Sequence, residues 1–216
     1  MIAALIPVKR LDAAKSRLWP QLPRASVERL TIAMLEDVLA ALLAVRALGT
    51  VVVVTEDESA GRTARAAGAR ALVRPDPGLN AALDAAAAEL AGEGAHAVLI
   101  VLGDVAGVTS ADVAELLGAL DALGRRGVVL APSRDGGTSA LLRAPHDAIP
   151  SRFGPASAAA HRECALAARV PYRELALPSL AVDLDRAEDV EELLRGAQGA
   201  ARTRRALHEL GWAGAC

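Results

Sequence analysis

The sequence predicts an α/β protein built on a three-layer, mostly parallel (mixed) β-sheet. Short apolar runs rich in β-branched residues alternate along the chain with longer segments whose apolar residues recur at helical spacing. The chain has 216 residues, of which 53% are hydrophobic, and this is enough to bury one core. No repeat or linker divides it, so we expect a single domain over residues 1–195 and a C-terminal helical tail over 196–216.

The first half of the chain alternates strand and helix patterns from its start. The apolar run 2–8 predicts a buried strand, and Ser26 is expected to cap a helix that ends before Gly49. Further strands are expected at 50–55, 71–73 and 97–102, with helices ending near Gly68 and spanning 79–91. The strand at 97–102 is the most apolar, and we therefore predict that it is central.

The second half predicts an antiparallel excursion and a return to helix. Thr109 and Asp112 form the pattern of a capping box that opens a helix ending near Gly124. Runs 128–131 and 139–143 flank an Asp-Gly-Gly turn and predict a hairpin. Later expectations are a helix at 157–168, a last strand at 180–184, and a helix to Leu194 that Asp185 and Glu188 would open as a second capping box.

Composition excludes several classes of function. The net charge is −2 and only four residues are aromatic, so neither a global positive field nor a stacking platform for nucleic acid is present. Cys164 and Cys216 are far apart and show no metal-ligand spacing. No uncharged apolar stretch reaches spanning length and no signal peptide is evident, so we expect a cytoplasmic protein without membrane or nucleic-acid partners.

Basic residues gather where the first strand ends. Lys9, Arg10, Lys15 and Arg17 follow the strand, with Asp12 as the one acid between them. Ligand crevices of α/β sheets lie outside the carboxyl ends of strands, so this loop is a candidate phosphate site. A solvated basic loop is the alternative. Glycine-rich phosphate loops are absent, and side chains and a metal would therefore have to hold any phosphate.

Three aspartates form the second candidate group. Asp104 follows the most apolar strand, and Asp183 and Asp185 would share one face of the predicted last strand. Carboxylates at strand ends can hold Mg²⁺, which prefers oxygen ligands. The alternative is that Asp185 caps a helix and Asp104 forms a turn.

Six segments, in one order, resemble a known enzyme family. They are IPVKRLDAAKSRL from Ile6, DPGLNAAL from Asp76, GD at Gly103, GGTSALL from Gly136, RFGPASAAAH from Arg152 and VDLDRAEDV from Val182. Over residues 1 to about 195 the chain resembles the guanylyltransferases that activate 2-phospholactate or phosphoenolpyruvate on the route to coenzyme F-420. The resemblance implies a glycosyltransferase-A-like nucleotidyltransferase fold.

The resemblance also implies roles for individual residues. Lys9, Lys15 and Arg17 correspond to the cations that contact phosphates, and Asp104, Asp183 and Asp185 to the ligands of Mg²⁺. The acceptor-binding positions correspond to Leu79, Thr138, Gly154 and Ser157, with Asn80 as a hydrogen-bonding neighbour. This chain reads Asp104-Val105-Ala106 where relatives read Asp-Leu-Pro. His161 would either donate to a phosphate or serve as a buried structural residue.

The implied reaction moves GMP from GTP onto the phosphate of a small phosphorylated carboxylic acid and releases pyrophosphate. The acceptor would be phosphoenolpyruvate or 2-phospho-L-lactate, and an Ala- and Arg-rich composition favours the first, which is the bacterial acceptor in this family. Two alternatives stay open: a nucleotidyltransferase of similar fold for a sugar phosphate or the molybdenum cofactor, and a non-catalytic nucleotide-binding domain. A homodimer is compatible with the sequence, which does not set the oligomeric state.

Overall fold

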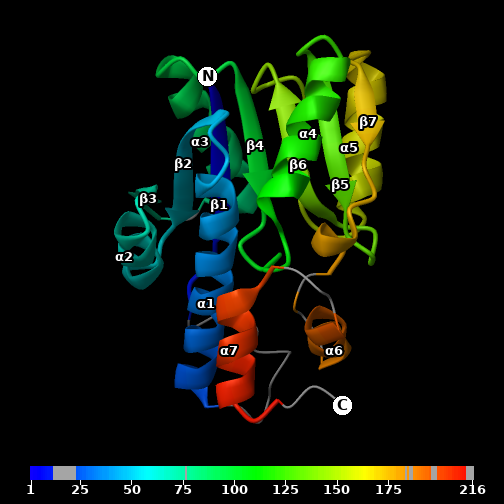
Figure 1. The fold of residues 1–216 in the computed structure, drawn as a ribbon. Coiled ribbons are helices and arrows are strands. Elements are labelled where there is room, and N and C mark those ends of the chain that lie inside the picture. Colours follow the sequence, from blue (N-terminus) through cyan, green and yellow to red (C-terminus); the bar gives the residue numbers. More distant parts are fainter. Residues whose placement is uncertain (12–22, 76, 183, 185–186, 196–198, 213–216) are drawn as a thin grey trace.

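A mixed β-sheet forms the core of the molecule (Figure 1). The computed structural model describes residues 1–11, 23–75, 77–182, 184, 187–195 and 199–212. The strands lie in the order β3-β2-β1-β4-β6-β5-β7. Their bounds are β1 Ile2–Val8, β2 Leu48–Thr55, β3 Arg70–Val73, β4 Ala97–Val101, β5 Gly127–Pro132, β6 Thr138–Ala144 and β7 Tyr172–Glu174.

The strand directions confirm the mostly parallel sheet and its antiparallel excursion. β1 pairs in parallel with β2 and β4, and β2 with β3, whereas β6 runs antiparallel to both β4 and β5. The apolar strand β4 is central, as predicted. β7 pairs in parallel with β5 and was not predicted, because three residues are too few to show a period.

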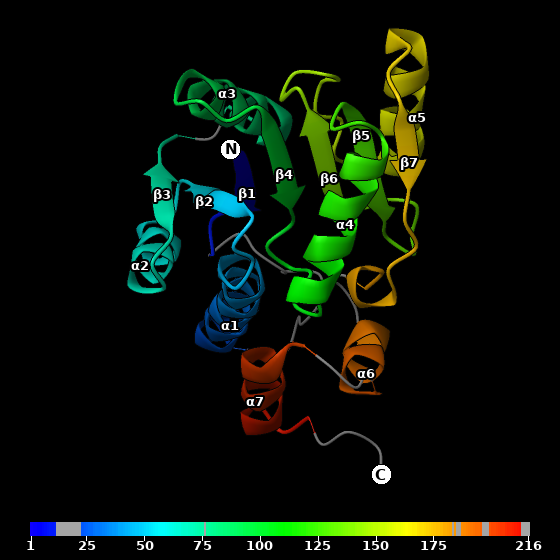
Figure 2. The ribbon, with the colours of Figure 1, turned by 45° about the horizontal axis from the view of Figure 1, so that its top comes forward.

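Helices cover both faces of the sheet, so the three-layer prediction is confirmed (Figure 2). α1, α2 and α4 pack on one face, and α3 and α5 on the other. The helix bounds are α1 Arg24–Leu43, α2 Glu58–Ala66, α3 Leu79–Gly92, α4 Ser110–Ala122, α5 Ser157–Ala168, the 3-10 turn η1 Pro178–Leu180, α6 Ala187–Arg195 and α7 Ala201–Glu209.

Two helix starts show where local signals succeed and fail. The Thr109–Asp112 capping box is present at the start of α4, as predicted. Ser26 does not cap α1: the helix begins two residues earlier, at Arg24, after Pro23. The backbone N–H of Ser26 donates to the Pro23 carbonyl at 2.9 Å, so Ser26 already lies in the first turn.

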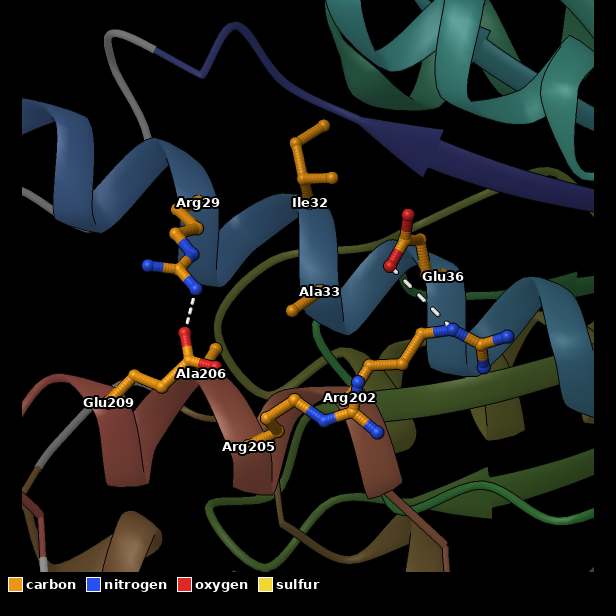
Figure 3. A pocket seen from close by; sticks show the side chains of 8 residues that line it. All are labelled: Arg29, Ile32, Ala33, Glu36, Arg202, Arg205, Ala206 and Glu209. Atoms are coloured by element: carbon orange, nitrogen blue, oxygen red, sulfur yellow. Dashed lines mark ion pairs between the residues drawn. The ribbon is translucent and has the colours of Figure 1, made fainter.

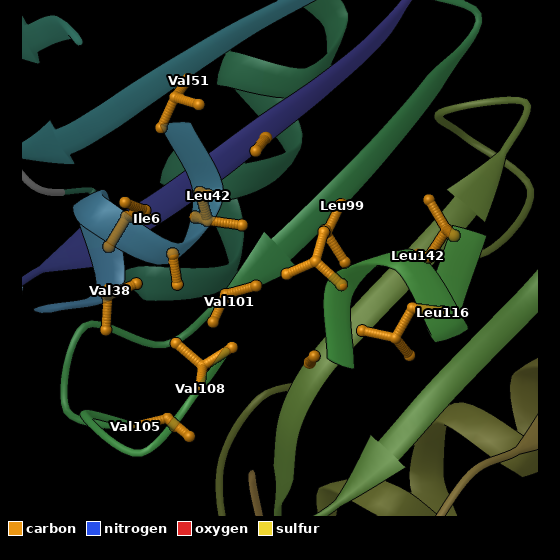
Figure 4. Close-up of a cluster of buried hydrophobic side chains, with 14 of the residues drawn as sticks. Ile6, Val38, Leu42, Val51, Leu99, Val101, Val105, Val108, Leu116 and Leu142 are labelled. Atoms are coloured by element: carbon orange, nitrogen blue, oxygen red, sulfur yellow. The ribbon is translucent and has the colours of Figure 1, made fainter. Parts of the chain in front are cut away.

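The core lies between α1, α4 and the middle strands (Figure 4). Every residue of β4 is buried, with Leu99 and Val101 facing the same layer as Leu116 of α4 and Val38 of α1. Parallel strands covered on both faces read as continuous apolar runs, and this is why β4 was recognisable in the sequence.

The predicted last strand at 180–184 is wrong. Pro178–Leu180 is a 3-10 turn, and the described residues Ala181, Val182 and Leu184 pair with no strand. Pro178 cannot donate a ladder hydrogen bond, and Leu180 is buried in the core beside α4 without a strand partner. Apolar residues at every second position are buried here, and this produced the alternating pattern that is typical of a strand. Sequence spacing therefore does not place Asp183 and Asp185 on one face of a strand.

The C-terminal helix α7 packs along α1. Asp37 of α1, which is buried, accepts hydrogen bonds from the backbone N–H groups of Arg202 and Thr203 at 3.1 and 2.8 Å and from the Thr203 hydroxyl at 2.8 Å. A pocket of about 340 Å³ lies between the two helices (Figure 3). Its lining residues all come from α1 and α7, and ion pairs of Arg29 with Glu209 and of Arg202 with Glu36 cross it.

None of the helices in the described part of the chain is both long and apolar enough to cross a membrane.

Candidate functional site

Lys9, Asp104 and Thr138 lie at one edge of the sheet, which we call the carboxyl edge. Lys9 follows β1 and Asp104 is the third residue after β4, and these two strands run parallel. Thr138 begins β6, whose antiparallel register places Ala140 opposite Val101 at the end of β4. The Leu102 N–H donates to the Ser139 carbonyl at 3.1 Å, which continues this pairing toward Asp104.

Gly103 holds Asp104 close to the end of β1. A Cβ atom at Gly103 would lie 3.0 Å from the carbonyl oxygen of Pro7 and 3.1 Å from Val8 Cγ2. A side chain at this position would force its neighbours to shift by a few tenths of an ångström, so the close approach favours glycine. The residue before the candidate metal ligand therefore packs directly beside the residues before Lys9, whose side chain is exposed.

Asp57 fixes the start of the basic loop and was not identified from the sequence. Its Oδ1 caps α2 by accepting from the N–H groups of Ser59 and Ala60, at 2.8 and 3.3 Å. Its Oδ2 accepts from the N–H of Leu11 at 3.1 Å. An Asp directly before a helix predicts the cap, but nothing in the sequence predicts the contact with residue 11. Lys15 and Arg17 lie outside the described residues.

The segment that carries the other two candidate metal ligands is anchored near Asp104. Leu184 is buried in one cluster with Ala106 and with Met34 of α1. A Cβ at Gly107 would lie 2.6 Å from the Ser179 carbonyl oxygen, so the chain just before this segment touches the loop that follows Asp104. Asp183 and Asp185 themselves lie outside the described residues. Within the described ranges Asp104 belongs to no cluster of three metal-ligating side chains.

Asn80 connects α3 to the segment before α5. Its Nδ2 donates to the Phe153 carbonyl at 3.0 Å, and its Oδ1 accepts from the Phe153 N–H at 2.7 Å. Leu79 is the first residue of α3, and it follows Gly78, whose φ of 105° is a conformation that favours glycine. The two predicted acceptor positions at the start of α3 therefore lie beside the segment that leads to Gly154.

Thr138, Ser157 and His161 form a buried hydrogen-bonded group. Ser157 Oγ donates to Thr138 Oγ1 at 3.1 Å, and Thr138 Oγ1 lies 3.0 Å from His161 Nδ1. The exposed fractions of Thr138, Ser157 and His161 are 2%, 1% and 0%. Burial, followed by the nearby Arg143 guanidinium, lowers the pKa of His161 to about 4, so the ring is neutral at pH 7. The structure thus brings together two predicted acceptor residues and buries both side chains.

A second hydrogen-bonded group, not identified from the sequence, joins the buried Arg143 to the partly exposed Asp84. Arg143 of β6 is 1% exposed and donates from Nη1 to Asp84 Oδ1 at 3.0 Å and to the Ile149 carbonyl at 2.6 Å. Asp84 also accepts from the N–H and hydroxyl of Ser151, the latter at 2.6 Å. An Arg in an apolar strand was the only sequence signal, and a buried Arg requires such partners.

Gly154 lies in an exposed turn at the start of α5. Its φ is 141°, and Ala156, the residue before the helix, has a φ of 54° in the left-handed region. A non-glycine residue adopts that region at a cost of about 1 kcal/mol, so neighbouring contacts must hold the turn. One of them is the Ala158 N–H, which donates to the Gly136 carbonyl at 3.2 Å.

A family model described as "Guanylyl transferase CofC like" matches residues 2–213. The chain belongs to this family. Two relatives carry the name phosphoenolpyruvate guanylyltransferase. That of Sphaerobacter thermophilus is 40% identical over 88% of this chain and 91% of its own length, and that of Rubrobacter xylanophilus is 38% identical over 89% and 93%. The family match includes α7, which lies beyond the motifs seen in the sequence, and it identifies the chain as a nucleotidyltransferase.

Solved structures share the fold at low sequence identity. A Desulfovibrio desulfuricans protein described as a nucleotide-diphospho-sugar transferase has a TM-score of 0.77 and 18% identity over 97% of this chain and 95% of its own. Glucosyl-3-phosphoglycerate synthase from Mycobacterium tuberculosis, solved with Mn²⁺, has a TM-score of 0.53 and 15% identity over 81% and 68%. These likenesses confirm the predicted nucleotidyltransferase-type fold.

Proposed function

We propose that this protein transfers GMP from GTP to the phosphate of phosphoenolpyruvate or 2-phospho-L-lactate and releases pyrophosphate. The observation that carries the proposal is the family match together with relatives of 35–40% identity that bear the name phosphoenolpyruvate guanylyltransferase. Phosphoenolpyruvate is the preferred acceptor on that ground. The step would belong to coenzyme F-420 biosynthesis in the cytoplasm.

The reaction needs charge neutralisation more than acid–base catalysis. An oxygen of the acceptor phosphate attacks the α-phosphorus of GTP, a new P–O bond forms, and the bond to the β-phosphate oxygen breaks, so pyrophosphate leaves with the electron pair. A phosphate monoester has a second pKa of about 6, so the attacking oxygen is already anionic at pH 7. The barrier is then the approach of two polyanions, which positioned cations lower.

Cations for this purpose would come from the carboxyl edge. Lys9 is exposed directly after β1, and Lys15 and Arg17 follow in the same loop. Lys as a point charge and Arg as a planar fork both bind phosphate oxygens. We assign these three side chains to the triphosphate and to the leaving pyrophosphate.

A divalent ion would complete the neutralisation. Asp104 offers carboxylate oxygens just after β4, and we assign Asp183 and Asp185, which flank Leu184 in the sequence, as the other two ligands. Carboxylates in such a position suit Mg²⁺, and the Mn²⁺ in a structure of similar fold is consistent with a divalent ion. Bound there, the ion would offset negative charge on the phosphates of both substrates.

The acceptor would bind between the starts of α3 and α5. Leu79, Asn80, Thr138, Gly154 and Ser157 all come from this region. Because Thr138 and Ser157 bury their side chains, and the N–H groups of Ser157 and Ala158 already donate to backbone carbonyls, the exposed turn at Gly154 is the part that would contact the acceptor.

Pyrophosphate release tests the proposal. The wild-type protein is incubated with Mg²⁺, each nucleoside triphosphate in turn, and either phosphoenolpyruvate, 2-phospho-L-lactate or glucose 1-phosphate. We expect release with GTP and a three-carbon phospho-acid. Asp104→Asn should lower turnover by about 10²-fold, the scale of losing one preorganised electrostatic group. Asp121→Asn, on the surface of α4, is the control and should keep turnover. Release with the sugar phosphate alone, or with no acceptor, would refute it.

A further inference from the structure

Three consecutive backbone amides before the Gly154 turn are each held by a side chain. The Ser151 N–H donates to Asp84, the Arg152 N–H to His161 Nε2 at 2.9 Å, and the Phe153 N–H to Asn80 Oδ1. Asp84 and Asn80 belong to α3, and His161 belongs to α5. We call residues 151–153 the held segment. Side chains of two different helices therefore set the path of the chain into the turn.

His161 is the one of these three side chains that also reaches the start of β6. Its Nε2 contacts the held segment and its Nδ1 lies 3.0 Å from Thr138 Oγ1. Thr138 in turn accepts from Ser157 at the start of α5. A single ring thus connects the held segment, the first residue of β6 and the first turn of α5.

The contacts determine which nitrogen carries the proton. A backbone N–H can only donate, so Nε2 must be the unprotonated acceptor, and a neutral ring then carries its hydrogen on Nδ1. The Nδ1–H then faces Thr138 Oγ1 and the backbone of Ser157. Both ring nitrogens are occupied, and the side chain is fully buried, with the Phe153 ring edge-on at 5.1 Å between centroids. His161 therefore has no nitrogen left for a phosphate.

We infer that His161 is a positioning residue for the acceptor: it fixes the held segment and Thr138 relative to each other, and so shapes the site between the Gly154 turn and α5. The inference rests on the proposed function, because it concerns the acceptor of that reaction. We assign GTP to the loop after β1 and to the candidate metal ligands, so its binding should not change when His161 is replaced. Misplacement of about 1 Å at a substrate-positioning group can cost up to about 10²-fold in rate.

Three substitutions separate the two hydrogen bonds. His161→Gln places an amide oxygen near the Nε2 position and can keep the bond from Arg152. His161→Asn places an amide N–H near the Nδ1 position and can keep the bond to Thr138. His161→Leu removes both. Val113→Ala, a small truncation in α4 on the opposite face of the sheet, shows what loss of stability alone does.

The readout is the KM for phosphoenolpyruvate against the KM for GTP, measured by pyrophosphate release on folded protein. We expect the phosphoenolpyruvate KM to rise by about tenfold for His161→Leu and by about threefold for each one-bond variant, with the GTP KM within about twofold. Val113→Ala should change neither KM. Protection of the melting temperature by phosphoenolpyruvate should weaken in the same order.

The possible failures are distinguishable. If all folded variants keep the wild-type KM for phosphoenolpyruvate, His161 only stabilises the fold and the inference is wrong, while the proposed function stands. The same conclusion follows if both KM values rise together. If His161→Leu does not fold, the Gln and Asn variants decide, through the rise of the phosphoenolpyruvate KM relative to the GTP KM. If the wild-type protein releases no pyrophosphate, the proposed function fails and this inference falls with it.

Discussion

The backbone of Gly103 touches that of Pro7, so closely that a Cβ atom on Gly103 would lie 3.0 Å from the Pro7 carbonyl oxygen. Real Cβ atoms seldom approach an oxygen this closely, and the obstacle is the backbone of β1 in a rigid core. This contact sets the distance between the two strand ends that carry Lys9 and Asp104.

Gly103→Ala should therefore impair both activity and stability. A shift of a few tenths of an ångström moves Asp104, and we expect turnover to fall by about tenfold with a loss of about 1–2 kcal/mol in unfolding free energy. Gly118→Ala is the control: Gly118 lies in α4, where an added Cβ meets nothing within 4 Å. That variant should gain about 0.5–1 kcal/mol and keep full turnover. Denaturant unfolding and pyrophosphate release measure both.

Lys9→Ala should lower activity and leave stability nearly unchanged, which is the opposite of what loss of a structural residue does. The side chain is exposed at the end of β1, and its removal should leave the melting temperature within about 1–2 °C of wild type. Loss of a phosphate-binding cation should lower kcat/KM by about 10²-fold. A variant that melts early while its folded fraction keeps full kcat/KM would assign Lys9 to the fold instead.

Asp37→Ala should detach α7 from α1. The carboxylate accepts three hydrogen bonds at the start of α7, and its loss leaves buried N–H groups without an acceptor, at a cost of about 1–3 kcal/mol. Limited proteolysis should then cleave first in the C-terminal region. The neighbouring Glu36→Ala removes only a half-exposed ion pair with Arg202, and we expect a change below about 0.5 kcal/mol. Equal melting temperatures for the two variants would show that the cap contributes nothing.

Acid should destabilise the protein partly through His161. Its pKa is about 4 in the folded chain and 6.5 ordinarily, because burial and the Arg143 and Arg152 charges outweigh Asp84. Between these pH values the unfolded chain binds more protons than the folded chain. The contribution of neutral His161 to the free energy of unfolding is therefore complete above pH 6.5 and is lost as pH falls toward 4. It amounts to at most about 3 kcal/mol.

The difference between wild type and His161→Gln isolates that contribution, since both share every other titrating group. Unfolding free energy measured from pH 7.5 to 4 should fall more steeply for the wild type. Parallel curves would mean that His161 keeps an ordinary pKa.

The sequence was sufficient to predict β1 and β4, because strands buried on both faces are continuous apolar runs, whereas the three-residue β7 was too short to show a pattern. It failed at 180–184, where Leu180 and Leu184 are buried in different clusters by a chain that pairs with no strand. Periodicity reports burial, and the hydrogen-bond partner that makes a strand lies elsewhere in the chain.

The candidate site was likewise predictable from the sequence only in part. Lys9 and Asp104 could be placed at one edge, because that follows from strand direction alone. Asp57, Asp84 and Arg143 could not, because each acts on a residue 46 to 67 positions away. Only the folded chain shows that Asn80 and His161 hold neighbouring peptide groups.

The most direct test of guanylyl transfer follows the phosphorus atoms of GTP. The protein is incubated with phosphoenolpyruvate, Mg²⁺ and GTP labelled at the α- or the γ-phosphate, and the products are separated. We expect the α-label to appear in a guanylylated three-carbon acid and the γ-label in pyrophosphate, in equal amounts. Recovery of the γ-label in the acid or in inorganic phosphate, with the α-label in GDP, would contradict it.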